Sequence, residues 1–460
     1  MAVLCANSNS YAQKNKEAGK KYEWTDVDTE EMYRFLGIIT YTTLCHLPSL
    51  PDYWALNSVT SQSVPRSVMT RDRFSIIWWN IHLSNPEEDR VNDARGLGGY
   101  DKLFRIKPLY DTVRMACKTH YHPRQQVSVD ERMLATKAKT GMTQYMRDKP
   151  TKWGLKLFVL ADSSNGYTVD FNMYTGKTNT PIIHGLAFDV VMALVTSASL
   201  GTGYHLYMDN FYSSPALFNA LRYIQVGACG TYRENRKGCP RLRDNALTKK
   251  AARGSIRWLR EDNVLFVKWM DTKEVAVCST IHQAFSGEEV VRQVKQNDQW
   301  RQQRFPCPAP IMAYNRYMGG VDRSDQLLNY YSAHRRSNRW YRTVFLHLFD
   351  IATGNAFLLH KELTEAGRAM SHKSFMDKLC SELFGFEPNT VPKNRSSVHV
   401  PVPVFTGPVD RSLRATRGRQ QCRRCLRQRR MRKDTPWKCQ ACGVALCLTL
   451  ERNCFKMWHL

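Results

Sequence analysis

Four aspartates lie inside or just after an expected strand or at the opening of an expected helix, and these residues are the best placed for chemistry. Asp130 lies in V-S-V-D-E-R and Asp209 ends the apolar segment Y-H-L-Y-M-D-N, while Asp322 and Asp325 lie in G-G-V-D-R-S-D-Q. At positions i and i+3, the last two share one face of the expected helix. Clustered carboxylates are costly unless a cation neutralises them, and Mg²⁺ prefers oxygen ligands of this kind.

Such a cluster points to phosphoryl transfer. Two Mg²⁺ ions about 3.5–4 Å apart activate the attacking oxygen and stabilise the leaving oxygen in an in-line displacement. In a basic protein, this is the site that cutting or joining a nucleic-acid backbone requires. The spacing leaves alternatives open, because an Asp at a strand end is commonly a turn residue and an Asp in a first helical turn commonly a dipole partner. Asp162, at the end of another expected strand, is an equally good candidate by local pattern.

A second set of candidate ligands closes the chain. Two C-x2-C pairs separated by thirteen residues are typical of zinc sites, and thiolate and imidazole suit Zn²⁺ in a closed tetrahedral site. Two complete sites need eight ligands, so either one ligand lies outside the pattern or only one site is full. A RING- or PHD-like interaction module is an alternative, although no His follows shortly after Cys439. The candidate zinc ligands are Cys422, Cys425, Cys439, Cys442, Cys447, Cys454 and His459.

The charge balance indicates a polyanionic partner. The chain has 460 residues with 67 Lys and Arg against 41 Asp and Glu, a formal net charge of +26, which is most often the footprint of nucleic-acid binding. Residues 411–438 hold twelve of these cations and one acid, which favours phosphate contact, a nuclear localisation signal or a solvated loop. The arginines expected to contact DNA are Arg335, Arg336 and Arg339 after the acidic helix, and Arg423, Arg424, Arg427, Arg429 and Arg430 in the tail.

The elements that must position these residues change along the chain. Apolar residues recur at helical spacing after Asp28 and after Thr70, so the first 120 residues are expected to be helical, except that polar residues 1–20 are expected to be loose. Residues 127–225 alternate between strand and helix patterns, which describes a mixed sheet flanked by helices. We expect neither a membrane span nor a secretory signal, because no apolar run of roughly 18 residues and no basic start occur.

Five blocks occur along the chain in the order V-D-E-R-M-L, K-P-T-K-W-G-L-K, M-D-N-F-Y-S-S, Y-N-R-Y-M-G-G-V-D-R-S-D-Q and S-N-R-W-Y-R. In sequence and order they resemble the piggyBac family of DDE/DDD transposases, and the early L-P-S-L-P-D-Y-W resembles that family's helical domain. The resemblance implies an α/β fold with an RNase H-like catalytic core, a helical dimerisation and DNA-binding domain, a β-rich insertion and a C-terminal zinc-binding cross-brace domain. The tail would hold one or two structural Zn²⁺ ions and contact terminal-repeat DNA.

The resemblance also implies an activity and its residues. It makes Asp130, Asp209 and Asp322 the catalytic, Mg²⁺-binding aspartates and Asp325 the additional acidic residue, with Lys152 of the second block contacting DNA. The family cuts and pastes DNA at TTAA sites, with Mg²⁺ supporting nicking and 3′-hydroxyl attack. We therefore expect a DNA transposase in the nucleus, a homodimer whose partners are double-stranded transposon ends and the TTAA target.

An alternative function comes from the amino-terminal region. Only about 20 residues precede the helical domain, where family members usually have a long acidic region, so a domesticated DNA-binding protein without cleavage is the alternative.

Pattern and resemblance together predict the domain boundaries. The expected domains are 1–20, disordered; 21–125, first helical part; 126–225, catalytic core; 226–312, β-rich insertion; 313–330, last acidic helix of the core; 331–385, second helical part; 386–420, basic linker; and 421–460, zinc-binding domain.

Overall fold

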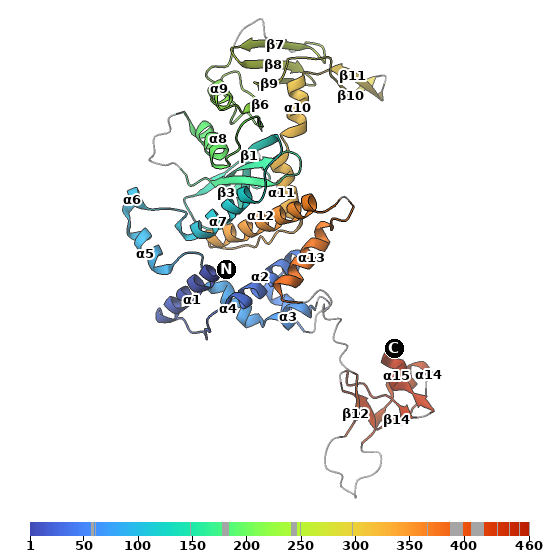
Figure 1. Cartoon of the computed structure of the whole chain (residues 1–460). Coiled ribbons are helices and arrows are strands. Elements are labelled where there is room, and N and C mark those ends of the chain that lie inside the picture. Colours follow the sequence, from blue (N-terminus) through green and yellow to red (C-terminus); the bar gives the residue numbers. More distant parts are fainter. Residues whose placement is uncertain are drawn as a thin grey trace. The chain divides into compact units, whose positions relative to one another are not determined.

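The computed structural model divides the chain into two compact units, Met1–Phe384 and Gly385–Leu460 (Figure 1). None of the helices in the part of the chain that the structure describes is long and apolar enough to cross a membrane. The structure describes all residues except 57–58, 60, 148, 177–183, 241–245, 249, 297, 366, 387–398, 406–417, 430, 441, 450 and 460, and except the side chains of 97–98 and 427–429.

A mixed sheet forms the centre of the first unit. Its strand order is β2-β3-β1-β5-β6-β9-β8-β7, with β4 also paired to β3. The β1–β5 and β5–β6 pairs are parallel and the others are antiparallel. The strands are β1 (Gln126–Ala135), β2 (Thr143–Tyr145), β3 (Trp153–Asp162), β4 (Thr168–Met173), β5 (His205–Met208), β6 (Gly227–Thr231), β7 (Ile256–Glu261), β8 (Val264–Met270) and β9 (Glu274–Ser279).

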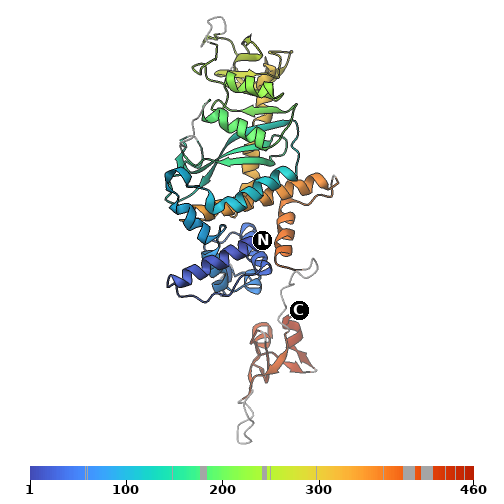
Figure 2. The same ribbon diagram turned by 60° about the vertical axis from the view of Figure 1, so that its left-hand side comes forward.

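Helices cover this sheet, as the succession of strand and helix patterns predicts. The long helix α12 is buried along most of its length and packs against α7, α11 and β1, and Figure 2 shows α7 and α12 side by side below the strands. Ser214 caps α9, since its hydroxyl accepts a hydrogen bond from the N–H of Leu217. The helices around the sheet are α7 (Lys107–Thr119), α8 (Leu186–Ser197), α9 (Pro215–Tyr223), α10 (Ala309–Tyr317), α11 (Gly320–Tyr330) and α12 (Trp340–Leu363).

A cluster of helices precedes the sheet and is completed from later in the chain. Helix α13 packs against α2, where Gly37 allows close approach, because a Cβ there would lie 2.6 Å from the Phe384 ring. The side chain of Asp28 accepts from the N–H of Glu31 and caps α2. These elements are α1 (Ala2–Glu17), α2 (Thr29–Leu44), η1 (Leu50–Trp54), α3 (Val64–Val68), α4 (Arg71–Asn80), α5 (Pro86–Ala94), α6 (Gly96–Gly99), η2 (Phe104–Ile106) and α13 (His372–Leu383).

The expectation that residues 1–20 are loose is wrong. Ala2–Glu17 form helix α1, in which Cys5, Ser8, Ala12 and Asn15 are buried. The amide of Asn15 donates to the side-chain oxygen of Asn80 at 2.9 Å. The polar composition of this segment predicts a loose chain, because it offers few apolar residues to bury. In the structure, polar side chains hold the helix in place through hydrogen bonds instead.

The predicted insertion, residues 226–312, needs correction in two respects. Strand β6 pairs parallel to β5 and so belongs to the core, and β9, β8 and β7 continue the same sheet beyond it. Only β10 (Glu289–Gln296) and β11 (Gln299–Pro306) form a separate two-stranded hairpin. The sequence G-A-C-G-T gives β6 no strand signal, but its small residues allow close packing, since a Cβ at Gly230 would meet Ser213 Oγ at 2.2 Å.

The second unit is small and rich in short strands. Part of the predicted linker, 386–420, is ordered, because Pro401–Pro403 form β12, which pairs antiparallel to β15; residues 387–398 and 406–417 lie outside the described part. Its elements are β12 (Pro401–Pro403), β13 (Gln420–Gln421), α14 (Arg423–Arg429), β14 (Asp434–Thr435), β15 (Trp437–Cys439), β16 (Leu448–Thr449), β17 (Arg452–Asn453) and α15 (Cys454–His459).

Candidate active site and metal centres

The pairing of two parallel strands brings the first two predicted aspartates together. Strand β1 runs parallel to β5, and the last residues in register are Val129 and Met208. Asp130 is the next residue of β1, and Asp209 directly follows β5, so both lie at the same point of the sheet. This point is the carboxyl end of β5, and carboxyl ends of parallel strands are where α/β sheets place functional groups. The strand order therefore explains why residues seventy-nine positions apart meet.

A third carboxylate joins them, and it is not one of the predicted ligands. Oxygens of Asp130, Glu131 and Asp209 lie within 4.8 Å of one another. Asp130 Oδ1 accepts from the backbone N–H of Glu131 at 2.7 Å. Two ammonium groups face the cluster, with Lys149 Nζ 3.2 Å from Asp130 Oδ2 and Lys156 Nζ 3.1 Å from Glu131 Oε1. Three converging carboxylates are a donor set that fits a hard divalent cation such as Mg²⁺.

Burial controls the protonation of this cluster. Desolvation raises the pKa of Asp130 to about 7, because removal from water disfavours the charged form more than Lys149 favours it. Burial also acts on Glu131, but its hydrogen bond with Asp130 and the charge of Lys156 outweigh it and lower that pKa. Desolvation and the charge of Glu131 raise the pKa of Asp209. Carboxylates this close repel one another, and a divalent cation would relieve that repulsion.

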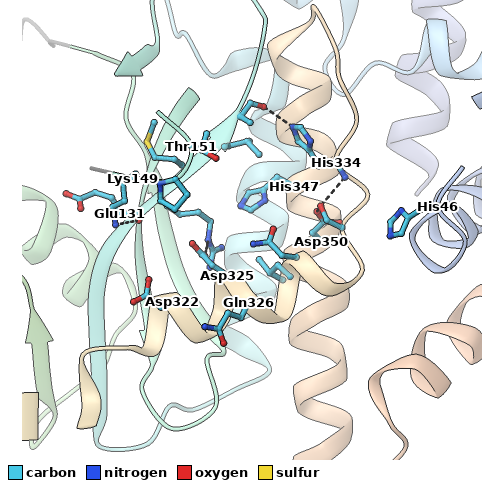
Figure 3. A pocket seen from close by; sticks show the side chains of 18 residues that line it. His46, Glu131, Lys149, Thr151, Asp322, Asp325, Gln326, His334, His347 and Asp350 are labelled. Carbon is cyan, nitrogen blue, oxygen red and sulfur yellow. Dashed lines mark hydrogen bonds and ion pairs between the residues drawn. The ribbon is translucent and has the colours of Figure 1, made fainter. Parts of the chain in front are cut away.

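Helix α11 carries the remaining two predicted aspartates. Its first residue, Gly320, lies so close to the sheet that a Cβ would meet Ser128 Oγ at 2.4 Å and Asp162 O at 3.2 Å. Asp322, exposed in the first turn, lines the same cavity as Glu131 and Lys149 but does not belong to the three-carboxylate cluster. The helix thus faces Asp322 towards the cluster from a separate wall of the cavity (Figure 3).

Asp325 has a different environment from the other aspartates. Its Oδ1 accepts from Arg132 Nε at 2.5 Å, and Arg132 Nη2 donates to Ser324 Oγ at 2.8 Å. The Arg132 side chain is buried, so this ion pair joins β1 to α11. The geometry gives Asp325 a positioning contact. Asp162 is also committed elsewhere, since Oδ2 accepts from the N–H of Arg124 at 2.7 Å and Oδ1 from Ser164.

The cavity beside the carboxylates has a volume of about 710 Å³. Its wall is formed by β1, by the segment after β2, by α11 and by α12 (Figure 3). Two buried nitrogens on its lining, Arg132 Nη1 and His347 Nε2, have no hydrogen-bond partner within the described part of the chain. Asp350 also lines it and accepts from the N–H of Ala333 and the hydroxyl of Ser332, each at 2.8 Å.

The cations predicted to contact DNA fall into two groups. Arg335 Nη2 donates to the Tyr53 hydroxyl at 3.1 Å, and Arg339 Nη1 donates to the Tyr341 hydroxyl at 2.9 Å, so both are engaged within the protein. The exposed members are Lys152, Arg336 and Arg423, while Arg424 is half-buried. The side chains of Arg427 and Arg429, and all of Arg430, lie outside the described residues.

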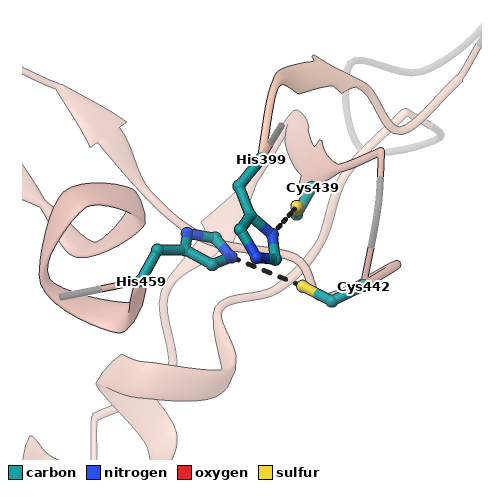
Figure 4. A group of neighbouring side chains, drawn as sticks. All are labelled: His399, Cys439, Cys442 and His459. Atoms are coloured by element: carbon teal, nitrogen blue, oxygen red, sulfur yellow. Dashed lines mark hydrogen bonds between the residues drawn. The ribbon is translucent and has the colours of Figure 1, made fainter. Parts of the chain in front are cut away.

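The cysteine-rich unit contains two sets of four candidate zinc ligands. Cys422, Cys425, Cys447 and Cys454 form one buried set; His399, Cys439, Cys442 and His459 form the other (Figure 4). Along the chain, three pairs of ligands alternate between the two sets, and a single histidine of the second set stands at each end, so the two sets interleave as in the expected cross-brace. His399 supplies an eighth candidate ligand, which the C-x2-C spacing left unidentified.

Distances within each set fit Zn²⁺. Cys425 Sγ lies 3.5 Å from Cys454 Sγ and 3.9 Å from Cys447 Sγ. Two thiolates on one tetrahedral ion with Zn–S bonds of about 2.3 Å would lie about 3.7 Å apart. In the other set, His399 Nδ1 lies 3.1 Å from Cys439 Sγ, and His459 Nε2 lies 3.5 Å from Cys442 Sγ. The donor chemistry and the spacing therefore both suit structural zinc.

Comparison with known proteins decides the family. A family model described as "Transposase IS4" matches residues 3–357, well over half of the chain. The chain is 27% identical over 430 residues to the human PiggyBac transposable element-derived protein 3, an alignment that covers 91% of this chain and 68% of that protein. The chain belongs to the piggyBac transposase family. A further model, described as a "DDE_Tnp_1-like zinc finger", matches residues 404–460 of this piggyBac-family chain.

Two further matches extend the comparison. The human PiggyBac transposable element-derived protein 2 is 27% identical over 358 residues, covering 75% of this chain and 58% of that protein. A cryo-EM structure of a piggyBac transposase in a synaptic complex with hairpin DNA superposes with a TM-score of 0.72 at 21% identity, covering 97% of this chain and 91% of that one. This likeness confirms the predicted fold class.

Three residues of the piggyBac-family site escape sequence reasoning. Strand alternation places neighbours on opposite faces, so a pattern that selects Asp130 gives no signal for Glu131. Their oxygens nevertheless meet, where β1 extends beyond the end of β5. Lys149 gives only a loop signal, although it lies in the K-P-T-K block. His399 precedes the residues that the zinc-finger model matches, and its position forty residues before Cys439 offers no spacing signal.

Proposed function

We propose that this chain is a Mg²⁺-dependent cut-and-paste DNA transposase that binds terminal inverted repeats, nicks and joins DNA, and inserts at TTAA sites. The observation that carries the proposal is the convergence of Asp130, Glu131 and Asp209 where the pairing of β1 with β5 ends, in a chain of net charge +26. A buried carboxylate cluster suits Mg²⁺, and a strongly basic chain suits a polyanionic substrate. Membership of the family supports both parts.

The residues have distinct proposed roles. Asp130 and Asp209, with Glu131 beside them, would hold the divalent ions, which when bound would polarise the scissile phosphate and its attacking oxygen. Asp322 would complete the ligand set from the wall formed by α11. Asp325 would position α11 through Arg132, since its carboxylate is already paired.

The partners proposed for the chain follow from its charge and from its zinc ligands. Double-stranded DNA would be bound by exposed cations such as Lys152, Arg336 and Arg423. Two structural zinc ions would hold the cysteine-rich unit, because so small a domain has little core of its own. We further propose a homodimer that acts in the nucleus, as the family resemblance implies.

A domesticated DNA-binding protein is the second candidate function. It is favoured by the curated relatives, which are transposable element-derived proteins by name. In that case the chain would bind DNA without cutting it. The retention of Asp130, Asp209 and Asp322 favours the active form.

The deciding experiment is a cleavage and strand-transfer assay with Mg²⁺ on TTAA-flanked candidate ends from the same genome. We expect nicking and joining by the unaltered protein and neither by Asp322→Ala. DNA binding without nicking in both proteins would favour the domesticated form. Binding is measured in parallel by gel shift, so that a loss of chemistry is separated from a loss of affinity.

A further inference from the structure

The ammonium group of Lys149 contacts one edge of the carboxylate cluster. Its Nζ is 3.2 Å from Asp130 Oδ2 and 3.1 Å from the backbone oxygen of Glu131. The residue belongs to the segment between β2 and β3, whose ends are held together by a 2.8 Å hydrogen bond from the N–H of Met146 to the carbonyl of Lys152. The loop therefore delivers one positive charge to an oxygen that the metal also needs.

Lys156, the other lysine of the cluster, is held differently. Its side chain is 9% exposed, and its Nζ lies 4.7 Å from the ring centroids of both Phe158 and Phe211. Two cation–π contacts and an ion pair to Glu131 fix it on the strand. The Lys149 side chain is 26% exposed and projects from a loop beside the large cavity. Of the two ammonium groups, Lys149 is the one that can leave.

We propose that Lys149 neutralises Asp130 in the metal-free protein and is exchanged for the divalent ion when that ion binds. An ammonium and Mg²⁺ compete for Asp130 Oδ2, because their like charges repel at such short range and each is bound more weakly in the presence of the other. This inference rests on the proposed metal-dependent function, and it adds a competitor for the site that is built into the chain.

The released ammonium would have a defined destination. Lys149 lines the cavity together with Asp322 (Figure 3), so a small rotation about its flexible side chain turns the charge from the cluster towards the space that DNA would enter. A phosphate of the bound strand is the natural partner for an ammonium displaced from a carboxylate. Metal binding would thereby prepare a DNA contact and would be favoured by DNA in return.

A titration of the purified full-length protein with Mg²⁺, followed by calorimetry in the absence of DNA, tests the exchange. We expect Lys149→Met to bind Mg²⁺ at least about fivefold more tightly, because a unit charge about 4 Å away contributes about 1 kcal/mol even in water. Lys139→Met is the matched control, an exposed lysine between β1 and β2, and should bind Mg²⁺ as the unaltered protein does. Unchanged or weaker binding by Lys149→Met would overturn the exchange.

A second measurement needs no variant at Lys149. Amine acylation of the unaltered protein, quantified by mass spectrometry at each lysine, should label Lys149 several times faster when Mg²⁺ is added, whereas buried Lys156 should not change. The Mg²⁺ effect should vanish in Asp209→Asn. A Lys149 rate that ignores or falls with Mg²⁺ would contradict the proposal. Failure of every protein to bind Mg²⁺ would refute the metal-dependent function itself, whereas binding without release of Lys149 would refute only the exchange.

Discussion

Arg132 on β1 and Asp325 on α11 form an ion pair, with the arginine Nε 2.5 Å from the aspartate Oδ1. The strand also carries Asp130, and the helix also carries Asp322. The ion pair therefore joins two walls of the cavity. One wall, β1, carries the carboxylate cluster, and the other, α11, carries Asp322. We therefore propose that Asp325, a predicted catalytic residue, acts by positioning Asp130 and Asp322.

Removal of this ion pair should cost stability. In Asp325→Asn the buried Arg132 loses its counter-charge, and since the Asp325 side chain is 33% exposed, we expect a loss of about 2–4 kcal/mol in the free energy of unfolding. Denaturant unfolding of the first unit measures it. Asp322→Asn, an exposed change on the same helix, should lose less than about 0.5 kcal/mol. Equal values for the two variants would contradict the positioning role of Asp325.

The two adjacent glycines at the start of α11 should respond differently to alanine. A Cβ at Gly320 would lie 2.4 Å from Ser128 Oγ and 3.1 Å from Ser163 Cα, whereas a Cβ at Gly319 meets nothing within 4 Å. Gly320→Ala must push the helix from the sheet, so we expect a stability loss of about 1–3 kcal/mol and lower nicking activity. Gly319→Ala is the matched control and should retain both. The account fails here if Gly319→Ala is the more damaging change.

The stability of the first unit should depend on pH through Asp350. Burial raises its pKa to about 7, outweighing the hydrogen bonds from Ala333 and Ser332, whereas the unfolded value is about 3.9. The native state therefore holds an extra proton between about pH 4 and 7. Stability should fall as pH rises through that window, on the order of 1 kcal/mol per pH unit at most, and level off above it.

Comparison with Asp350→Asn isolates that dependence. Asparagine can still accept from the N–H of Ala333 and cannot ionise, so its unfolding free energy should lack this slope. Urea unfolding of both proteins between pH 5 and 8 gives the difference. Parallel curves would mean that Asp350 keeps an ordinary pKa.

Zinc content should report the role of His399. We expect two Zn²⁺ per chain, and about one after His399→Ala, since Cys439, Cys442 and His459 alone leave the second site open. Elemental analysis of dialysed protein measures the content. Lys456→Ala, an exposed change on α15, serves as the control and should retain two ions. Full zinc content after His399→Ala would remove this histidine from the ligand set.

The part of the site that lies on regular elements was predictable from the sequence. Asp130 and Asp209 end apolar strand patterns, and parallel pairing of those strands brings them together. The alternating cysteine pairs likewise predict a zinc unit. Local patterns failed where a contact joins distant residues, as for His399, and where hydrogen bonds or small residues replace apolar packing, as in α1 and β6. These features depend on which segments meet, and one segment's periodicity does not contain that information.

The most direct test of the central claim is the rate at which Asp209→Asn nicks a transposon end in Mg²⁺, measured beside its affinity for the same DNA. The account predicts a loss of about a thousandfold or more, equivalent to about 4 kcal/mol in the barrier, with DNA affinity within about twofold. Asp377→Asn, an exposed aspartate on α13, should nick as the unaltered protein does. Equal nicking by Asp209→Asn and the unaltered protein would show that the chemistry is not performed by the carboxylate cluster.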